Sequence, residues 1–151
     1  MSTIITNRDD LPKDILELLI EAKKVSVNSY NRYSNFFVGA AVKTTSGKIY
    51  TGTNMENASY GLSICAEPAA IMSANSNGDN NIEIIAIVGG FNEDPNQEPA
   101  TPCGRCRQVI YEASQVVGKD IQVYCSNLSL SKVRVTTIEE LLPFAFHLKE
   151  V

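Results

Sequence analysis

The chain has 151 residues and a formal net charge of −4. We therefore expect one domain, residues 1–151, without a basic surface that could hold a nucleic acid by its phosphates. No apolar run approaches the roughly 20 residues of a membrane span, and the first residues lack the pattern of a secretion signal. These features predict a cytoplasmic protein that keeps its thiols reduced and acts on a small free substrate.

Hydrophobic periodicity and turn residues predict nine elements in the order α-β-β-α-β-α-β-β-α. In chain order they are a helix over 12–27, strands over 38–44 and 49–53, a helix over 65–75, a strand over 82–88, a helix over 103–115, strands over 121–125 and 131–136, and a helix over 138–146. Residues 1–8 are expected to form a polar, frayed end. The order predicts an α/β fold, a three-layer α-β-α sandwich around a mixed five-stranded sheet.

Three cysteines stand at the starts of two predicted helices. Cys65 opens one helix, and Cys103 and Cys106 open another. Residues three apart on a helix point the same way, and a helix N-terminus favours thiolates. Three converging thiolates could hold one Zn²⁺ and leave its fourth position to water, as catalytic zinc sites do. Glu67, two residues after Cys65, would then be placed to move protons to and from that water.

The combination of Cys65-x-Glu67 with Pro102-Cys103-x-x-Cys106 resembles the signature of zinc-dependent nucleoside and base deaminases. Most of the chain is similar to cytidine deaminases of the small, homotetrameric kind. The resemblance implies the cytidine deaminase-like fold, Zn²⁺ as the cofactor, and hydrolytic deamination of cytidine or 2′-deoxycytidine in pyrimidine salvage. It also implies a homotetramer whose partners are a nucleoside substrate and its own copies. The charge and the lack of a long apolar run, given above, argue against nucleic acid and membrane as partners.

The resemblance extends to residues that would bind the substrate. Phe36 matches an aromatic position that packs against the pyrimidine, and Asn54 and Glu56 match a pair that hydrogen-bonds the sugar 3′-hydroxyl. Phe146 matches a phenylalanine that reaches the site of a neighbouring subunit. The substrate-binding residues implied in this way are Phe36, Asn54, Glu56, Tyr60, Ala66 and Phe146.

Two positions depart from the pattern of the family. Pro68 follows Glu67 where arginine is usual, and Arg105 stands between the two later cysteines where a small residue is usual. Because three thiolates around Zn²⁺ leave a net negative charge, we expect Arg105 to supply the compensating positive charge. The same two positions resemble blasticidin S deaminases, so a modified cytosine nucleoside is the alternative substrate.

Interpretations without deaminase chemistry stay open for these residues. Cys125, on the buried face of a predicted strand, could complete a closed four-cysteine structural site. Cys103 and Cys106 could form a redox pair, although such a pair would not require a glutamate two residues after Cys65. Phe36 could be an ordinary core aromatic. The chain could also be a catalytically silent relative that only binds pyrimidines. Such a protein would hold zinc but release no ammonia from any pyrimidine.

Overall fold

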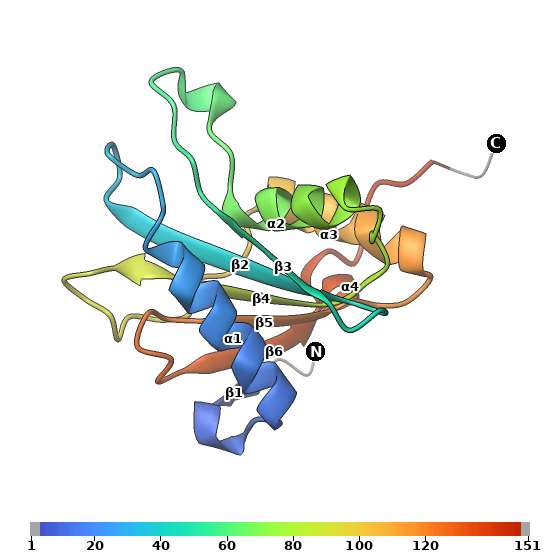
Figure 1. Cartoon of the computed structure of the whole chain (residues 1–151), viewed down its shortest axis with the longest axis horizontal. Helices are drawn as coiled ribbons and strands as arrows, with labels where there is room; N and C mark the ends of the chain where they lie inside the picture. Colours follow the sequence, from blue (N-terminus) through green and yellow to red (C-terminus); the bar gives the residue numbers. More distant parts are fainter. Residues whose placement is uncertain (1–3, 149–151) are drawn as a thin grey trace.

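The computed structural model describes residues 4–148, which form one mixed sheet with helices on both faces (Figure 1). The strands are β1 Ile4–Thr6, β2 Phe36–Thr44, β3 Ile49–Thr53, β4 Ile82–Phe91, β5 Gln122–Ser126 and β6 Val133–Thr137. The α-helices are α1 Lys13–Ser26, α2 Ala66–Ser76, α3 Gly104–Val117 and α4 Ile138–Leu141, and the 3₁₀ helices are η1 Arg8–Asp10 and η2 Tyr60–Leu62. None of the helices in this part of the chain has the length and apolar composition of a membrane span.

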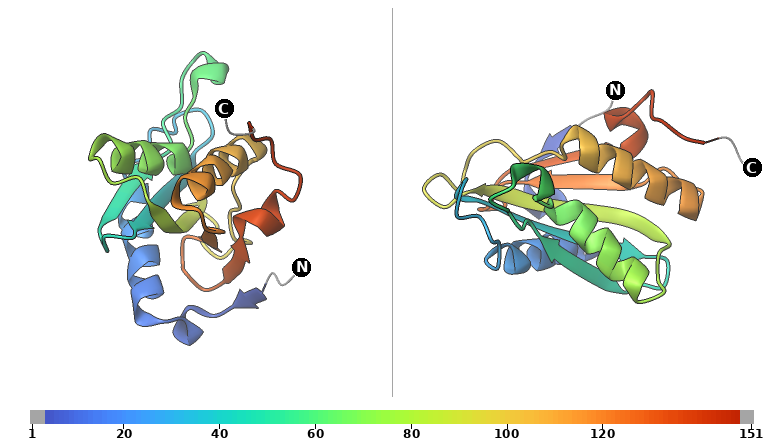
Figure 2. Two further views of the ribbon diagram at one scale, coloured as in Figure 1. Left: turned by 90° about the vertical axis from the view of Figure 1, so that its right-hand side faces the viewer. Right: turned by 90° about the horizontal axis from the view of Figure 1, so that it is seen from above.

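Side chains that alternate along β4 divide the core into two layers. Ile85 and Ile87 belong to the layer formed with α2 and α3, whereas Ala86 and Val88 belong to the layer formed with α1. The left-hand view of Figure 2 shows α1 on one side of the sheet and α2 and α3 on the other. The expected three-layer α-β-α arrangement is confirmed.

The direction of the strands brings the starts of α2 and α3 to the same end of the sheet. The strand order is β1-β6-β5-β4-β2-β3, with β4 parallel to β5 and β2 antiparallel to both of its neighbours. Strands β3 and β4 therefore run the same way, and each is followed along the chain by one of the two helices. Both helices begin near the carboxyl ends of their strands, which is where open α/β sheets bind ligands.

The expectation of five strands and a frayed N-terminus is wrong, because Ile4–Thr6 forms β1. This strand pairs antiparallel with β6, with Ile4 opposite Val135, and makes a sixth strand. A run of three residues is too short to show alternation, and its conformation is decided by the open edge of β6 that it covers. Residues 1–3 of the expected frayed segment lie outside the described residues.

The last helix is shorter than the predicted 138–146, since α4 ends at Leu141. Its start is as predicted, because the Glu140 N–H donates to the Thr137 hydroxyl at 3.3 Å. Pro143 has no N–H to continue the helix, and it disfavours the helical conformation at Leu142, whose φ is −143°. The chain therefore leaves the helix before it reaches Phe146.

Candidate metal centre and substrate cavity

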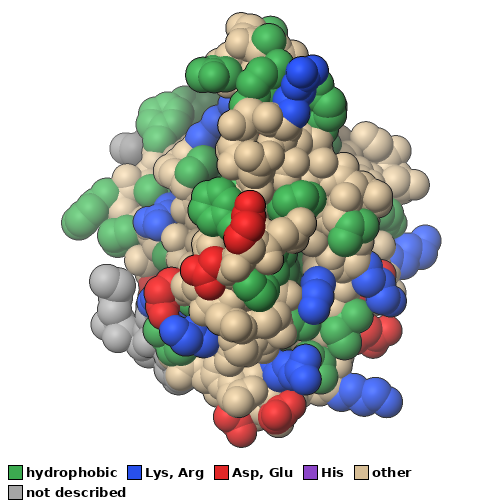
Figure 3. All heavy atoms as spheres, turned by 90° about the vertical axis from the view of Figure 1, so that its left-hand side faces the viewer, with side chains coloured by type: hydrophobic (Ala, Val, Ile, Leu, Met, Phe, Trp, Pro, Cys, Tyr) green, Lys and Arg blue, Asp and Glu red, His purple; other side chains and the backbone are tan. Residues whose placement is uncertain are grey.

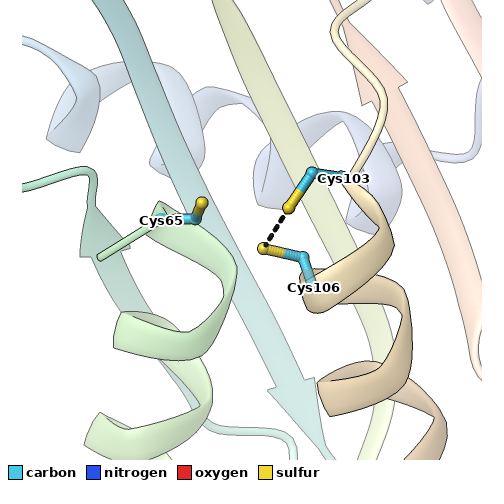
Figure 4. Close-up of side chains that lie close together, drawn as sticks. All are labelled: Cys65, Cys103 and Cys106. Carbon is cyan, nitrogen blue, oxygen red and sulfur yellow. Dashed lines mark hydrogen bonds between the residues drawn. The ribbon is translucent and has the colours of Figure 1, made fainter. Parts of the chain in front are cut away.

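Three thiols meet between the first turns of α2 and α3 (Figure 4). Cys65 and Cys103 are the N-cap residues of these helices, and Cys106 lies in the first turn of α3. The three Sγ atoms lie within 4.8 Å of one another, and those of Cys103 and Cys106 are 3.5 Å apart. Two sulfurs about 2.3 Å from one tetrahedral zinc ion lie roughly 3.8 Å apart, so this donor set fits Zn²⁺. Within residues 4–148 it is the one cluster of its kind.

The electrostatics of the three thiols favour a bound cation. The pKa of Cys65 is lowered to about 6, chiefly by a hydrogen bond from the Cys106 thiol. The pKa of Cys106 is raised, chiefly by that same bond to Cys65 and next by burial. Ionising one sulfur thus makes the next harder to ionise, because like charges repel at this distance. A divalent cation between the sulfurs removes that penalty.

Glu67 is the buried acid of the site. The residue is 4% exposed, and its Oε2 lies 3.5 Å from the Sγ of Cys106. Burial raises the pKa of the carboxyl and outweighs the hydrogen bonds that lower it. Glu67 is the second residue of α2, so regular helix geometry sets its position relative to Cys65. A buried carboxyl with a perturbed pKa beside three thiols is typical of a site that moves protons.

Pro68 and Arg105, the two departures from the family pattern, both fit this geometry. Pro68 is buried in the first turn of α2, where a missing N–H costs no helical hydrogen bond. Arg105 is exposed in the first turn of α3, and its charge is among the influences that lower the pKa of Cys65. A cation therefore lies near the thiols, and its role in zinc binding stays a prediction.

A cavity of about 340 Å³ opens beside the thiols. Seven of the residues predicted from sequence line it, namely Phe36, Asn54, Glu56, Cys65, Ala66, Glu67 and Cys103. Sequence reasoning missed the other lining residues, which are Ser34, Val38, Ser63, Ile64, Ile87, Ala100 and Thr101. The only sequence signal for Ala100 and Thr101 is their position directly before Pro102.

Asn54 and Glu56 also hold the wall of the cavity in place. The Asn54 Oδ1 accepts from the Val38 N–H at 3.0 Å, and its Nδ2 donates to the Phe36 carbonyl at 2.9 Å. The Glu56 Oε1 accepts from the N–H groups of Ser34 and Tyr33 at 3.1 and 3.0 Å. The pKa of Glu56 is lowered, chiefly by a hydrogen bond from the Ser34 side chain and then by these two backbone bonds. Both side chains therefore shape the loop that presents the Phe36 ring.

Tyr60 and Phe146 lie outside this cavity. Tyr60 is 75% exposed on the projecting loop between β3 and α2, where it lines an adjoining cavity of about 290 Å³ that shares Ser34, Glu56 and Ser63 with the first. Phe146 is 70% exposed, and its carbonyl accepts from Gln108 Nε2 at 2.8 Å on α3. Figure 3 shows the face at which α2 and α3 begin, with apolar side chains gathered at its top. A single copy of the chain does not bring these two rings to its own thiols.

Cys125 is not part of the cluster of thiols. It is fully buried on β5, and burial raises the pKa of its thiol to about 12. Its sulfur is not among those that lie within 4.8 Å of one another, which speaks against a closed four-cysteine site. The proximity of Cys65 to Cys103 and Cys106, which are all free thiols, favours a metal site over a simple redox pair.

Fold and site together define the class of zinc-binding deaminases, and comparisons with known proteins agree. The family model described as "Cytidine and deoxycytidylate deaminase zinc-binding region" matches residues 12–121. The chain is 38% identical over 133 residues to the cytidine deaminase of Sporosarcina psychrophila, covering 88% of this chain and 91% of that protein. It is 40% identical over 129 residues to the cytidine deaminase of Halalkalibacterium halodurans, covering 85% and 91%.

A solved structure leads to the same family. The crystal structure of cytidine deaminase from Burkholderia pseudomallei matches with a TM-score of 0.75 at 41% identity, covering 86% of this chain and 97% of that chain. The chain belongs to the cytidine and deoxycytidylate deaminase family, whose metal is zinc.

Proposed function

We propose that this protein catalyses the hydrolytic deamination of cytidine and 2′-deoxycytidine to uridine and 2′-deoxyuridine, a step of pyrimidine salvage. The observation that carries the proposal is the cluster of three thiols beside the buried Glu67, at a cavity of about 340 Å³ that Cys65, Cys103 and Glu67 line. A cavity of this volume is within the ordinary range for small-molecule sites. Free thiol ligands suit the reducing cytoplasm, which is the compartment we propose.

Cys65, Cys103 and Cys106 would hold the zinc ion. When bound, zinc supplies Lewis acidity that lowers the pKa of a bound water toward neutrality. Because three thiolates weaken that effect, positive charge near the sulfurs assists it. Arg105 supplies a full charge from α3, and the N-termini of α2 and α3 supply partial ones.

Glu67 carries the proton. It accepts a proton from the attacking water and passes it to N3 of the base as the water oxygen adds to C4. It then assists the transfer of a proton to the amino group on C4, which leaves as ammonia while the oxygen remains on the base. Burial of Glu67 keeps the transferred proton from exchanging freely with bulk water.

The cavity wall binds the nucleoside. Phe36 packs against the base, and Ala66, in the first turn of α2, lines the same cavity beside the base. Asn54 and Glu56 hydrogen-bond the sugar hydroxyls from the loop after β3. Tyr60 and Phe146, which are exposed and do not line the cavity beside the thiols, complete the site of a neighbouring copy in a homotetramer.

A panel of substrates tests the proposed reaction. Ultraviolet absorbance and ammonia release are followed for cytidine, 2′-deoxycytidine, blasticidin S and adenosine. We expect turnover of the first two and none of adenosine, since the relatives reported above are named cytidine deaminase. Zinc-loaded protein that releases no ammonia from any pyrimidine would refute the proposal. Turnover of blasticidin S alone would select the modified-nucleoside alternative.

A further inference from the structure

The segment 95–101 leads from the loop after β4 to Cys103, and only its last two residues reach the cavity. Ala100 and Thr101 line the cavity together with Cys103. The segment folds back closely over the end of β4. A Cβ added at Gly89 would lie 3.0 Å from the Ala100 Cβ, and a Cβ added at Gly90 would lie 3.4 Å from Cδ of Gln97. The placement of this segment therefore decides where the Cys103 sulfur lies.

Asn127 fastens the segment 95–101 to the turn that follows β5. The residue is completely buried, and its Nδ2 donates to the Gln97 carbonyl at 2.9 Å and to the Ser131 hydroxyl at 3.0 Å. Its Oδ1 accepts from the Ser131 N–H at 3.0 Å and from the Ser129 hydroxyl at 3.2 Å. Figure 1 shows the two loops, yellow and orange, at the same edge of the sheet. One side chain thus joins two loops that are far apart in the sequence.

The turn after β5 has a constrained backbone conformation, so it can anchor the segment 95–101. Leu130 is buried and adopts a φ of +59°, which a leucine keeps only where its surroundings over-determine it. The Leu130 N–H donates to the Asn127 carbonyl at 3.1 Å, and the Ser129 N–H donates to the Pro95 carbonyl at 3.0 Å. The turn and the segment 95–101 are therefore held together at two places.

The chain between Gln97 and Cys103 has little freedom to absorb a displacement. It contains Pro99 and Pro102, whose rings fix φ, and the Pro102 carbonyl accepts from Arg107 Nε at 2.9 Å. A shift at the Gln97 carbonyl is consequently passed on toward the metal cluster.

We infer that Asn127 is a positioning residue for the metal centre. Through the Gln97 carbonyl it sets the placement of Thr101 and Cys103 relative to Cys65, although it touches neither metal nor substrate. This role in catalysis rests on the proposed function, whereas its role in holding the metal does not require a particular substrate.

Asn127→Asp tests the inference. The substitution keeps an acceptor for the Ser131 N–H but replaces the donor with an oxygen that faces the Gln97 carbonyl. We expect zinc to be lost to a chelator roughly tenfold faster and the KM for cytidine to rise roughly tenfold. The thiolate-to-metal absorption of the Co²⁺-loaded protein should also shift, which reports the geometry of the sulfurs.

Ser126→Ala is the matched control. Ser126 is fully buried at the end of β5, and its hydroxyl donates to the Lys132 carbonyl at 2.9 Å, within the same turn. It should keep wild-type zinc retention and a wild-type Co²⁺ spectrum even if its melting temperature falls. Equal metal loss in both variants would overturn the inference, because general weakening of the turn would then be the cause.

The remaining outcomes are equally decisive. Wild-type zinc retention and a wild-type Co²⁺ spectrum in Asn127→Asp would overturn the inference whatever the stability of the variant. If Asn127→Asp does not fold, Asn127→Ala is measured in the same way, and failure of both to fold would make Asn127 a stability residue only. If the wild-type protein holds zinc but deaminates no pyrimidine, the proposed function fails while the two metal measurements still judge Asn127.

Discussion

Among single residues, Glu67 has three properties that a proton carrier needs. It is buried, it lies 3.5 Å from a thiol of the metal cluster, and the start of α2 fixes its direction. The spacing of Cys65 and Glu67 alone predicts this arrangement, because the second residue after a helix N-cap lies at a defined place in the first turn. Sequence could not reveal Asn127 or Thr101, since their positions depend on how two irregular loops fold together.

Glu67→Gln should preserve shape and burial but remove the proton acceptor. We expect kcat to fall by about 10²–10⁴-fold while zinc content and unfolding temperature stay close to those of the wild type. Steady-state kinetics and metal analysis check this, with Glu17→Gln on the exposed face of α1 as the control. Retention of most of the wild-type kcat would remove Glu67 from the mechanism.

Arg105→Ala should weaken the metal centre by removing its predicted counter-charge. We expect faster zinc loss to a chelator and a kcat lowered roughly tenfold, with partial rescue by Arg105→Lys, because the charge itself is what matters. Zinc retention and kinetics are measured at low and high salt. Wild-type values in Arg105→Ala would contradict the assigned role.

At the scale of elements, α2 depends on a close approach to β3. A Cβ added at Gly52 would lie 2.4 Å from the Ala70 nitrogen and 2.7 Å from the Ala69 Cβ, so the helix backbone itself would have to move. Since Cys65 and Glu67 lie at the start of α2, this contact sets the distance between the metal site and the sheet. Hydrophobic pattern predicts the strand and the helix, but it does not predict which glycine lies between them.

Gly52→Ala should therefore destabilise the protein by about 1–3 kcal/mol or prevent folding. Gly61→Ala is the matched control, because nothing lies within 4 Å of a Cβ at that position. Its effect should stay within about 0.5 kcal/mol. Denaturant unfolding measures both free energies, and equal values for the two variants would show that α2 does not pack on β3 as described.

Asp79 joins the β2–β3 hairpin to the segment before β4. Its Oδ2 accepts from the hydroxyls of Ser46 at 2.7 Å, Thr44 at 2.8 Å and Tyr50 at 3.0 Å, and the bonds from Ser46 and Thr44 are the largest causes that lower the pKa of Asp79. A carboxyl whose pKa is lower in the folded state stabilises the fold above its unfolded pKa of about 3.9, and this contribution is lost as pH falls through the folded pKa.

Asp79→Asn should accordingly be less stable than the wild type at pH 7, and the difference should close as pH falls from about 5 toward 2. Urea unfolding across this range provides the measurement. Asp9→Asn in η1 is the control, because that carboxyl is largely exposed. A gap between Asp79→Asn and wild type that does not change with pH would contradict the role of the charged carboxylate.

Several boundaries differ from the sequence predictions for identifiable reasons. β2 begins at Phe36, two residues before the predicted start, because Phe36 pairs with Phe91 and Asn54 binds the backbone on either side of Phe37. These are contacts between distant parts of the chain. Helix starts were easier to predict, since a cap such as Thr137 is a local signal.

At the scale of the whole molecule, the α/β class and the three layers could be predicted because alternating helices and strands permit few other arrangements. The short β1 could not, since its conformation depends on the edge of β6. The metal centre follows from the layers. Two helices begin at the carboxyl ends of strands that run the same way, and a zinc ion held by both would join them, so we expect metal binding to stabilise the fold.

Zinc content per chain, measured on purified, reduced protein and its single cysteine variants, tests the central claim most directly. We predict one zinc per chain in the wild type and in Cys125→Ser, and loss of zinc in alanine variants of Cys65, Cys103 and Cys106. Reduced wild-type protein without stoichiometric zinc, or loss of zinc in Cys125→Ser, would contradict a three-thiolate centre with an open fourth position.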